Sequence, residues 1–235
     1  MKRSELNSLI SKTVEFLKKN KFLLPPFAYW SPQEWRQKGD EVDEIRECML
    51  GWDLTDFGSG DFLKTGLLLF TIRNGHNNNP KYTHKTYCEK LLITEEEQVT
   101  PMHFHWSKVE DIINRGGGNL VIQLYNATKD DQLSDEEVSV SLDGVLTRVK
   151  AGGTVTLKPG ESICLPSRLY HKFWGEKDKG TVLVGEVSKV NDDKSDNRFY
   201  EKVGRFPRIE EDVPPQYLLF SEYPQHNAER SRNIA

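Results

Sequence analysis

The first 63 residues carry the apolar spacing of helices. Over residues 4–19 an apolar residue recurs every three or four positions, which predicts an amphipathic helix. The apolar face of this helix consists of Leu6, Ile10, Val14 and Leu17. Ser31, Pro32 and Glu34 then form a helix start, with an N-cap, a proline at the first helical position and a capping-box glutamate. With a further short helix near 41–49, residues 1–63 are predicted to be a helical extension.

From about residue 64 the pattern changes to short β-rich runs. Turn-forming pieces such as RGGGN, LDG, KAGG, KPGE and EKDKG separate these runs. The expected strands are 65–73, 87–94, 101–106, 110–114, 119–126, 138–140, 145–150, 153–157, 162–166, 171–174 and 181–190. No helical pattern of useful length interrupts them, so an antiparallel barrel or two-sheet jelly roll is favoured over a parallel sheet. The predicted fold class is all-β with an N-terminal helical extension. The barrel spans residues 64–211, and residues 212–235 form a polar C-terminal arm.

Composition narrows the possible partners. The chain has 235 residues, of which 36% are hydrophobic and 29% charged, as in an ordinary globular protein. Its net charge of −4 offers no basic field for nucleic acid or an anionic membrane. The longest apolar run, near residues 66–70, is too short to span a bilayer. The first residues, MKRSELNSLISK, lack the apolar core of a signal segment, and the three cysteines match no zinc or redox spacing. A cytoplasmic location is therefore expected.

Residues 101–110, PMHFHWSKVE, contain the strongest candidate for chemistry. His103 and His105 are two positions apart, so on a strand both imidazoles point to the same face. Glu110 opens the next run and could join them if the chain turns and the next strand lies beside the first. The segment 160–171 ends a later strand at Pro166 and returns with His171. Three imidazoles and one carboxylate suit a divalent ion such as Mn, Fe, Co, Ni or Zn.

Both segments resemble the two sequence motifs of the cupin superfamily. Residues 103–116 contain the two histidines, the glutamate and the glycine of the first motif, and Gly160, Pro166 and His171 match the second. Arg168 and Trp174 depart from the second motif, which usually carries glycine and asparagine there, but neither is a proposed ligand.

Longer stretches are similar to the D-lyxose ketol-isomerases within that superfamily. These stretches are GWDLTDFGSGDF (51–62), LLLFTIRNG (67–75), residues 99–119, YHKFWGE (170–176) and GEVSKVNDDKSDNRF (185–199). The resemblance implies a homodimeric, Mn²⁺-preferring enzyme with a cupin barrel. It implies the interconversion of D-lyxose with D-xylulose and of D-mannose with D-fructose.

Lys108 and Glu186 are the candidate catalytic residues for such an isomerisation. Lys108 lies between His105 and Glu110, where it could orient a substrate oxygen or donate a proton; a solvated turn lysine is the alternative. Glu186 shares a strand face with Val182 and Val184, and a carboxylate on an apolar face is costly unless paired or functional. It is expected to be the base, with a buried ion pair as the alternative.

Other polar residues could contact a sugar. Asp193, Asp196 and Arg198 could bind hydroxyl groups over the mouth of the site, or belong to an ordinary polar loop. Either Glu89 or Lys90 should face the barrel interior, but their alternation does not decide which. The other histidines, His76, His84 and His226, are expected in polar segments without a functional role.

Three other functions use similar residues. An Fe(II) cupin dioxygenase would need oxygen and gives no task to Lys108 or Glu186. A cupin phosphosugar isomerase would need a phosphate clamp, for which only Arg168 and Lys172 are candidates. A sugar-binding module without catalysis would not need four metal ligands. The expected ligand is a small sugar, with no nucleic acid and no membrane.

Overall fold

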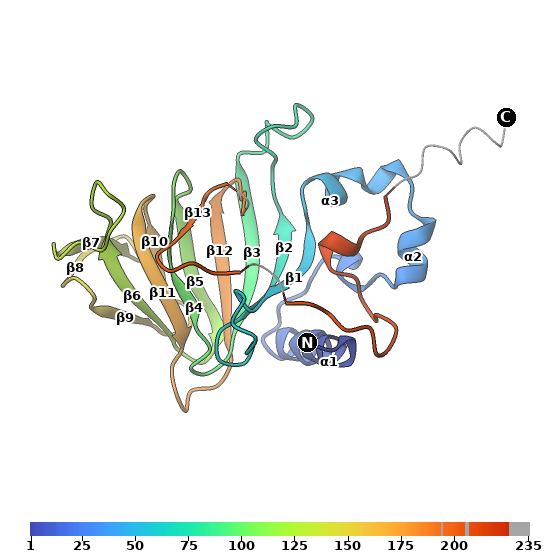
Figure 1. The fold of residues 1–235 in the computed structure, drawn as a ribbon, viewed down its shortest axis with the longest axis horizontal. Coiled ribbons are helices and arrows are strands. Elements are labelled where there is room, and N and C mark those ends of the chain that lie inside the picture. Colours follow the sequence, from blue (N-terminus) through green and yellow to red (C-terminus); the bar gives the residue numbers. More distant parts are fainter. Residues whose placement is uncertain (194, 205–206, 226–235) are drawn as a thin grey trace.

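Two antiparallel sheets face each other, and helices gather at one side of them (Figure 1). The computed structural model describes residues 1–193, 195–204 and 207–225. The helices are α1 (Arg3–Lys19), η1 (Pro26–Tyr29), α2 (Pro32–Gln37), η2 (Asp40–Val42), α3 (Asp43–Glu47) and η3 (Phe220–Glu222). The strands are β1 (Gly51–Thr55), β2 (Leu67–Arg73), β3 (Tyr87–Thr94), β4 (Thr100–His105), β5 (Glu110–Gly117), β6 (Leu120–Asn126), β7 (Val138–Leu142), β8 (Val145–Val149), β9 (Thr154–Leu157), β10 (Ser162–Leu165), β11 (Leu169–Gly175), β12 (Val182–Lys189) and β13 (Asn197–Phe199).

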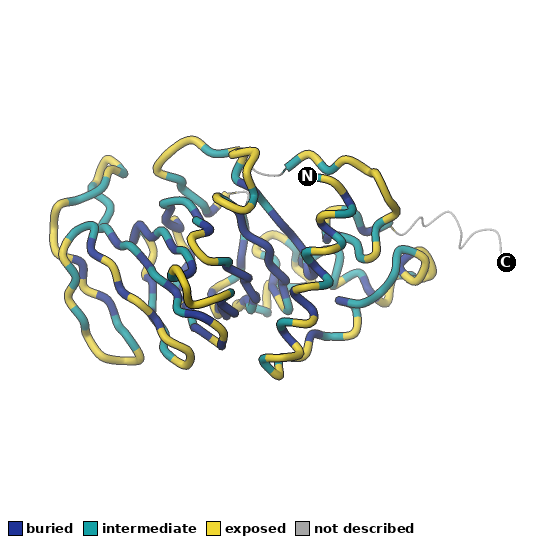
Figure 2. Tube along the Cα trace, turned by 90° about the horizontal axis from the view of Figure 1, so that it is seen from below, coloured by how far each residue is buried: buried dark blue, intermediate teal, exposed yellow. Residues whose placement is uncertain are grey.

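The larger sheet has the strand order β1-β2-β3-β12-β5-β10-β7-β8, and the smaller one β13-β4-β11-β6-β9. Between them lies an apolar core to which both sheets contribute alternate residues, as strand geometry requires. The tube in Figure 2 shows buried stretches along the strands and exposed residues mainly in the loops. This interior is where the predicted ligands project.

Helix α1 covers the outer face of the larger sheet. Its residues Leu6, Ile10 and Leu17 are fully buried and belong to a second core with outward-facing residues of β2, β3 and β12. On β2, Leu67 and Leu69 face the interior, while Leu68 and Phe70 face α1. Strands buried on both faces explain the continuous apolar runs of these segments.

The helix signals of the sequence are confirmed in detail. α1 begins at Arg3, and Ser31 caps α2: the Ser31 hydroxyl accepts a hydrogen bond from the Glu34 backbone N–H at 3.2 Å, and the Glu34 carboxylate accepts from the Ser31 N–H at 2.8 Å. All eleven expected strands are present, with ends shifted by a few residues.

Two strands come from segments without a strand prediction. β1 lies inside the predicted helical extension and pairs in antiparallel register with β2, and β13 lies in the polar segment after β12. Both are edge strands. In β1, Trp52 and Leu54 do alternate with polar residues, but five residues are few beside the helical pattern before them, and the three residues of β13 are too few to show any alternation.

The glycines 116–118 of RGGGN, which suggested a hairpin turn, connect two strands that do not pair with each other. β5 pairs with β10 and β12, whereas β6 pairs with β9 and β11 in the other sheet. Gly117 has φ +82°, and a Cβ there would lie 2.1 Å from the Thr181 carbonyl oxygen. The glycines therefore allow the chain to pass from one sheet to the other at close quarters.

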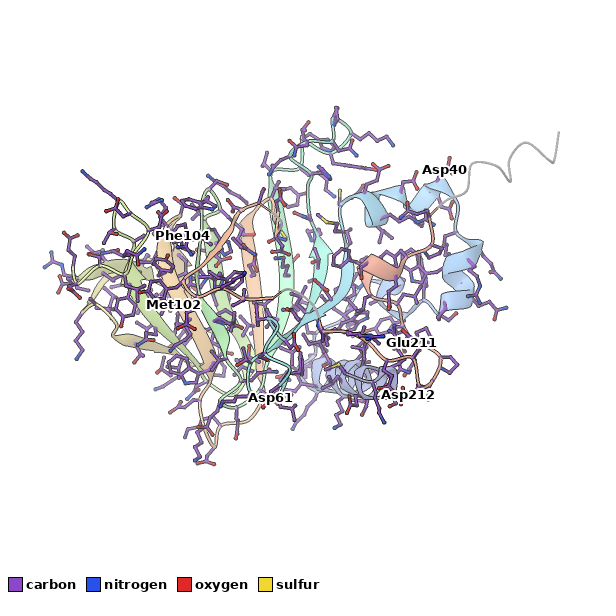
Figure 3. All side chains as sticks on the ribbon, in the orientation of Figure 1. Asp40, Asp61, Met102, Phe104, Glu211 and Asp212 are labelled. Carbon is purple, nitrogen blue, oxygen red and sulfur yellow. The ribbon has the colours of Figure 1, made fainter. Side chains whose placement is uncertain are left out.

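The described part of the C-terminal segment packs on the helices. Tyr223 stacks on Trp35 with ring centroids 3.8 Å apart, and Leu219 joins the core beneath α1. Glu211 and Asp212 lie beside α1 (Figure 3). Residues 226–235, which include His226, lie outside the described residues.

Candidate active site

Three histidines meet at the centre of the smaller sheet. His103 and His105 lie on β4, and His171 on β11 is the direct register partner of His103. Residues in register point to the same face, so all three imidazoles enter the interior. Their ligand nitrogens lie within 4.8 Å of one another, and the rings of His103 and His171 have centroids 4.1 Å apart.

Glu110 reaches the histidines from the opposite sheet. β5, which it opens, is not a neighbour of β4, so the predicted hairpin between these strands is corrected. Glu110 Oε1 lies 3.3 Å from His105 Nε2 and 3.2 Å from His171 Nε2. Metal–ligand bonds of about 2.1 Å at right angles place donors about 3 Å apart, so these separations fit neighbouring ligands of one ion.

The imidazole nitrogens fit a metal ion. The Nδ1 atoms of His103 and His171 lie 2.7 Å and 3.0 Å from the backbone carbonyls of Pro101 and Leu169. Such a contact places the proton on Nδ1 and directs the Nε2 lone pair inward. Buried His171 Nε2 forms no hydrogen bond in the described part of the chain, although it lies 3.2 Å from Glu110 Oε1. A lone pair that faces a carboxylate oxygen in this way is what a cation between the two atoms would satisfy.

The protonation states also suit a cation. Burial, together with His171 and His105, lowers the pKa of His103 well below its usual value. Burial and the nearby Lys108 ammonium lower the pKa of His105. Burial alone would raise the pKa of Glu110, but Lys108 and His105 outweigh it and hold that pKa well below its usual value. Neutral imidazoles and an ionised carboxylate are ready ligands.

Lys108 and Glu186, the predicted catalytic pair, lie together beside the ligands. Lys108 Nζ is 2.7 Å from Glu110 Oε2 and 2.8 Å from Glu186 Oε1, and both lysine and glutamate are buried. Burial by itself would lower the pKa of Lys108, but the two carboxylates outweigh burial and raise this pKa above its usual value. The side chain therefore stays an ammonium. Burial raises the pKa of Glu186, but Lys108 and Lys90 reverse this, so the carboxylate is ionised. A raised pKa, expected for a proton shuttle, is therefore not what this environment gives.

A second lysine extends this chain of charges. Lys90 on β3 faces the interior, whereas Glu89 pairs outside with Arg73, with Nε and Oε2 2.7 Å apart. Lys90 Nζ lies 3.6 Å from Glu186 Oε2 and 3.9 Å from Asp193 Oδ1, and donates to Asn191 Oδ1 at 2.5 Å. The alternation of Glu89 and Lys90 indicated one inward residue, and the register of β3 against β12 decided which.

One cavity of about 290 Å³ is lined by the three histidines, Glu110 and the charged residues beside them. The metal ligands, Lys90, Lys108, Glu186 and Asp193 form its polar side. Its apolar side includes Leu67, Leu69, Leu92, Ile112 and Phe173. A volume near the lower end of ligand pockets, with convergent charges on one wall, suits a small polar molecule.

Known proteins with similar sequences are sugar isomerases. A profile of the family described as D-lyxose isomerase matches residues 1–223. The D-lyxose/D-mannose isomerase of Serratia proteamaculans is 51% identical over 224 residues, covering 95% of this chain and 98% of that protein. The D-lyxose/D-mannose isomerase of Escherichia coli O157:H7 is 48% identical over 226 residues, covering 96% and 99%. The chain belongs to the D-lyxose isomerase family.

Solved structures agree on the fold. The L-ribose isomerase of Cellulomonas parahominis superposes with a TM-score of 0.59 at 15% identity, covering 89% of this chain and 98% of that one. The L-ribose isomerase of Acinetobacter sp. DL28 gives a TM-score of 0.56 at 14% identity, covering 86% and 93%. The cupin-type barrel predicted from the sequence is thus confirmed for this member of the D-lyxose isomerase family.

The segment after β12 closes the cavity of this family member. β13 pairs with β4 so that Phe199 lies opposite His103 and Asn197 opposite His105. Phe199 stacks on His103, with centroids 5.3 Å apart and planes at 28°. Asn197 and Phe199 line the cavity. The sequence interpretation missed these two residues because a strand of three residues gives no pattern.

Arg198, predicted to contact the sugar, is placed differently. It lies opposite Phe104 in the register of β13 and β4, and it is not among the residues that line the cavity. Its guanidinium donates to the Phe199 carbonyl oxygen. Met102 and Phe104 (Figure 3) alternate in sequence with the two histidines of β4, and Phe104 contacts Trp106 and Tyr170. Phe104 thus packs in an aromatic cluster outside the cavity, whereas Phe173 lines the cavity.

The remaining sequence candidates lie away from the cavity. His76 and His84 are in the connection between β2 and β3. The three cysteines form no disulfide, and Cys48 and Cys88 are buried. Among the described residues, no helix is both long and apolar enough to cross a membrane.

Proposed function

We propose that the chain is a metal-dependent aldose–ketose isomerase that interconverts D-lyxose with D-xylulose and D-mannose with D-fructose. One observation carries the proposal: the donor atoms of His103, His105, His171 and Glu110 converge in the cavity that Lys108 and Glu186 line. Family membership supports the substrates, because both similar proteins are named D-lyxose/D-mannose isomerases.

We propose Mn²⁺ as the ion that these four residues hold. Their three nitrogens and one carboxylate oxygen suit several first-row divalent ions. When bound, such an ion supplies Lewis acidity to the sugar carbonyl and its neighbouring hydroxyl. The five charged groups Glu110, Glu186, Asp193, Lys108 and Lys90 sum to −1, which favours cation binding.

Glu186 is the proposed base. Isomerisation moves a proton from C2 to C1, while the carbonyl and hydroxyl oxygens exchange roles. The Glu186 carboxylate, held ionised by Lys108 and Lys90, takes the C2 proton, and the electrons of that bond form the enediol double bond. The same carboxyl group then returns the proton to C1, while the proton of the C2 hydroxyl passes to the C1 oxygen, so that the C2 oxygen becomes the carbonyl and the base is regenerated.

Lys108 is proposed to stabilise the developing negative charge. Its ammonium is held between Glu110 and Glu186, so it can donate a hydrogen bond to a substrate oxygen close to the base. Burial of both side chains excludes bulk water from the proton transfer. Asp193, on the same cavity wall, is proposed to accept hydrogen bonds from sugar hydroxyls. Arg198 remains a weaker prediction, because contact with the sugar would require it to leave the Phe199 carbonyl.

The homodimer and the cytoplasmic location are also retained as proposals. Free cysteines are consistent with a reducing compartment. Light scattering on the purified protein tests the dimer, and a mass of one chain would contradict it.

The deciding experiment is ketose formation by chelator-stripped protein before and after addition of Mn²⁺. D-Lyxose and D-mannose should be converted only after the metal is restored, without oxygen consumption. Equal turnover by fully stripped protein would contradict metal dependence. Protein that binds one metal per chain but forms no ketose would contradict the proposed substrates. Turnover of phosphorylated sugars would then indicate a phosphosugar isomerase, and oxygen uptake would indicate a dioxygenase.

A further inference from the structure

The turn that carries Lys108 is held mainly by one buried residue, Asp196. Its Oδ1 accepts hydrogen bonds from the Ser107 backbone N–H and the Ser107 hydroxyl, both at 2.8 Å. Its Oδ2 accepts from the Lys108 backbone N–H at 3.1 Å. The Asp196 backbone carbonyl accepts from the Trp106 N–H at 2.9 Å. Three successive backbone N–H groups of the turn are therefore held by one residue.

This turn needs an external support because it crosses between the sheets. It leaves β4 in the smaller sheet and enters β5 in the larger one, and the hydrogen bonds of the two sheets reach only Trp106 and Val109, so that residues 107 and 108 between them belong to neither ladder. Yet Lys108 must keep its ammonium 2.7 Å and 2.8 Å from two carboxylates. Contacts this short change steeply in energy with small displacements when they are buried.

Asp196 is more than a local cap of the turn. It is 8% exposed, and within the described residues it takes part in no ion pair with a lysine or arginine. Its charge is instead balanced by the three donors of a turn that lies 88 or 89 positions earlier in the chain. Asp196 also directly precedes β13, whose residues Asn197 and Phe199 line the cavity. One side chain thus links two separate segments of the site.

We propose that Asp196 is a positioning residue, which fixes the turn 106–108 so that the Lys108 ammonium stays between Glu110 and Glu186. Its effect on turnover rests on the proposed function, whereas its effect on the turn does not. This role replaces the sugar contact that the sequence suggested for Asp196, because its carboxylate oxygens are occupied by the turn.

The kinetic test compares Asp196→Ala, Asp196→Asn and the control Ser195→Ala in Mn²⁺-loaded enzyme. Ser195 belongs to the same loop, but its hydroxyl contacts Asp192 and not the turn. We expect Asp196→Ala to lower kcat for D-lyxose roughly 10–100-fold, as for residues that support a metal site. KM and bound Mn²⁺ should change less than about twofold. Asp196→Asn, which keeps one acceptor oxygen, should be intermediate, and Ser195→Ala should match wild type.

The structural test needs no activity and uses metal-free protein. Hydrogen exchange of the Ser107 and Lys108 amides, followed by NMR, should be slow in wild type and Ser195→Ala and at least tenfold faster in Asp196→Ala. Unchanged exchange, unchanged kcat, or a parallel loss of metal and of thermal stability would overturn the positioning role. If wild type forms no ketose while Asp196→Ala still speeds exchange of the Ser107 and Lys108 amides, that result contradicts the proposed function and supports the role of Asp196 in holding the turn.

Discussion

At the residue scale, the site is a chain of charges that compensate one another, and all of them except the partly exposed Asp193 are buried. Glu110, Lys108, Glu186, Lys90 and Asp193 alternate in sign, with Nζ–O distances from 2.7 Å to 3.9 Å. An isolated buried charge would cost several kcal/mol, so each group depends on its neighbours for its ionised state. Removal of a charge therefore affects both catalysis and the protonation of the next residue.

Metal binding and proton transfer should separate by mutation. We expect His103→Ala to abolish Mn²⁺ binding and activity, whereas Glu186→Gln should retain the metal and lose at least 100-fold in kcat, because an amide cannot accept the C2 proton. Metal analysis and ketose assays on the same preparations measure this. His84→Ala, at an exposed position, is the matched control. Full activity of metal-loaded His103→Ala would refute the metal site, and full activity of Glu186→Gln would remove only the base assignment.

The residues found from the sequence are those whose spacing has a direct geometric meaning. His103 and His105 share a face because they are two apart on a strand, and Glu186 was noticed because it interrupts an apolar face. Asn191, Asn197 and Phe199 lie in a polar segment without periodicity, so only the register of β13 against β4 and the contacts of Lys90 reveal their position.

At the element scale, strand burial on both faces organises the molecule. β2, β3 and β12 send alternate residues into the barrel and beneath α1, which is why the apolar face of α1 has a partner within its own chain. The apolar pattern of α1 required a partner, but it could not identify the outer sheet. The strand order, which depends on pairing between segments far apart in the sequence, places β2, β3 and β12 side by side beneath α1.

The packing of α1 predicts a clear difference between two leucines. Leu6 is fully buried on the inner face of α1, whereas Leu23, just after the helix, is 79% exposed. Leu6→Ala should lower the free energy of unfolding by about 2–5 kcal/mol, because it removes buried methyl groups and leaves a cavity. Leu23→Ala should change it by less than about 0.5 kcal/mol. Urea unfolding measures both, and equal effects would contradict this packing of the helix.

At the scale of the whole molecule, the two ends of the described chain are tied together. The Arg3 guanidinium, 2% exposed, donates to Glu211 Oε2 from Nε at 2.9 Å, to Glu211 Oε1 from Nη2 at 2.6 Å and to Glu222. Ser4 adds hydrogen bonds to the Asp212 carboxylate. The C-terminal segment thereby joins α1 to the small aromatic core around Trp35.

This tie predicts a pH-dependent loss of stability. Hydrogen bonding to Arg3 holds the pKa of Glu211 below its usual value, so its contribution is present above about pH 4.5 and is lost as pH falls further. Arg3→Met should lower the free energy of unfolding by about 1–3 kcal/mol at pH 7. The difference from wild type should shrink between about pH 5 and pH 3. Urea unfolding across this range measures it.

The exposed Lys18–Glu15 pair provides the comparison for Arg3. Lys18→Met should have no measurable effect at any of these pH values, because water screens an exposed pair. A difference between Arg3→Met and wild type that is independent of pH would contradict the role of the carboxylates.

The sequence by itself determined the fold class, eleven of the thirteen described strands and the four proposed metal ligands. Period-two and period-3.6 patterns and ligand spacing are local properties, and each has one geometric meaning wherever the chain goes. Only the tertiary structure decided that Glu110 meets the histidines across the barrel, that Lys90 and not Glu89 faces inward, and that Asp196 holds the Lys108 turn. These contacts join residues on different strands or far apart in the chain, and sheet order and register, which no local pattern encodes, set them.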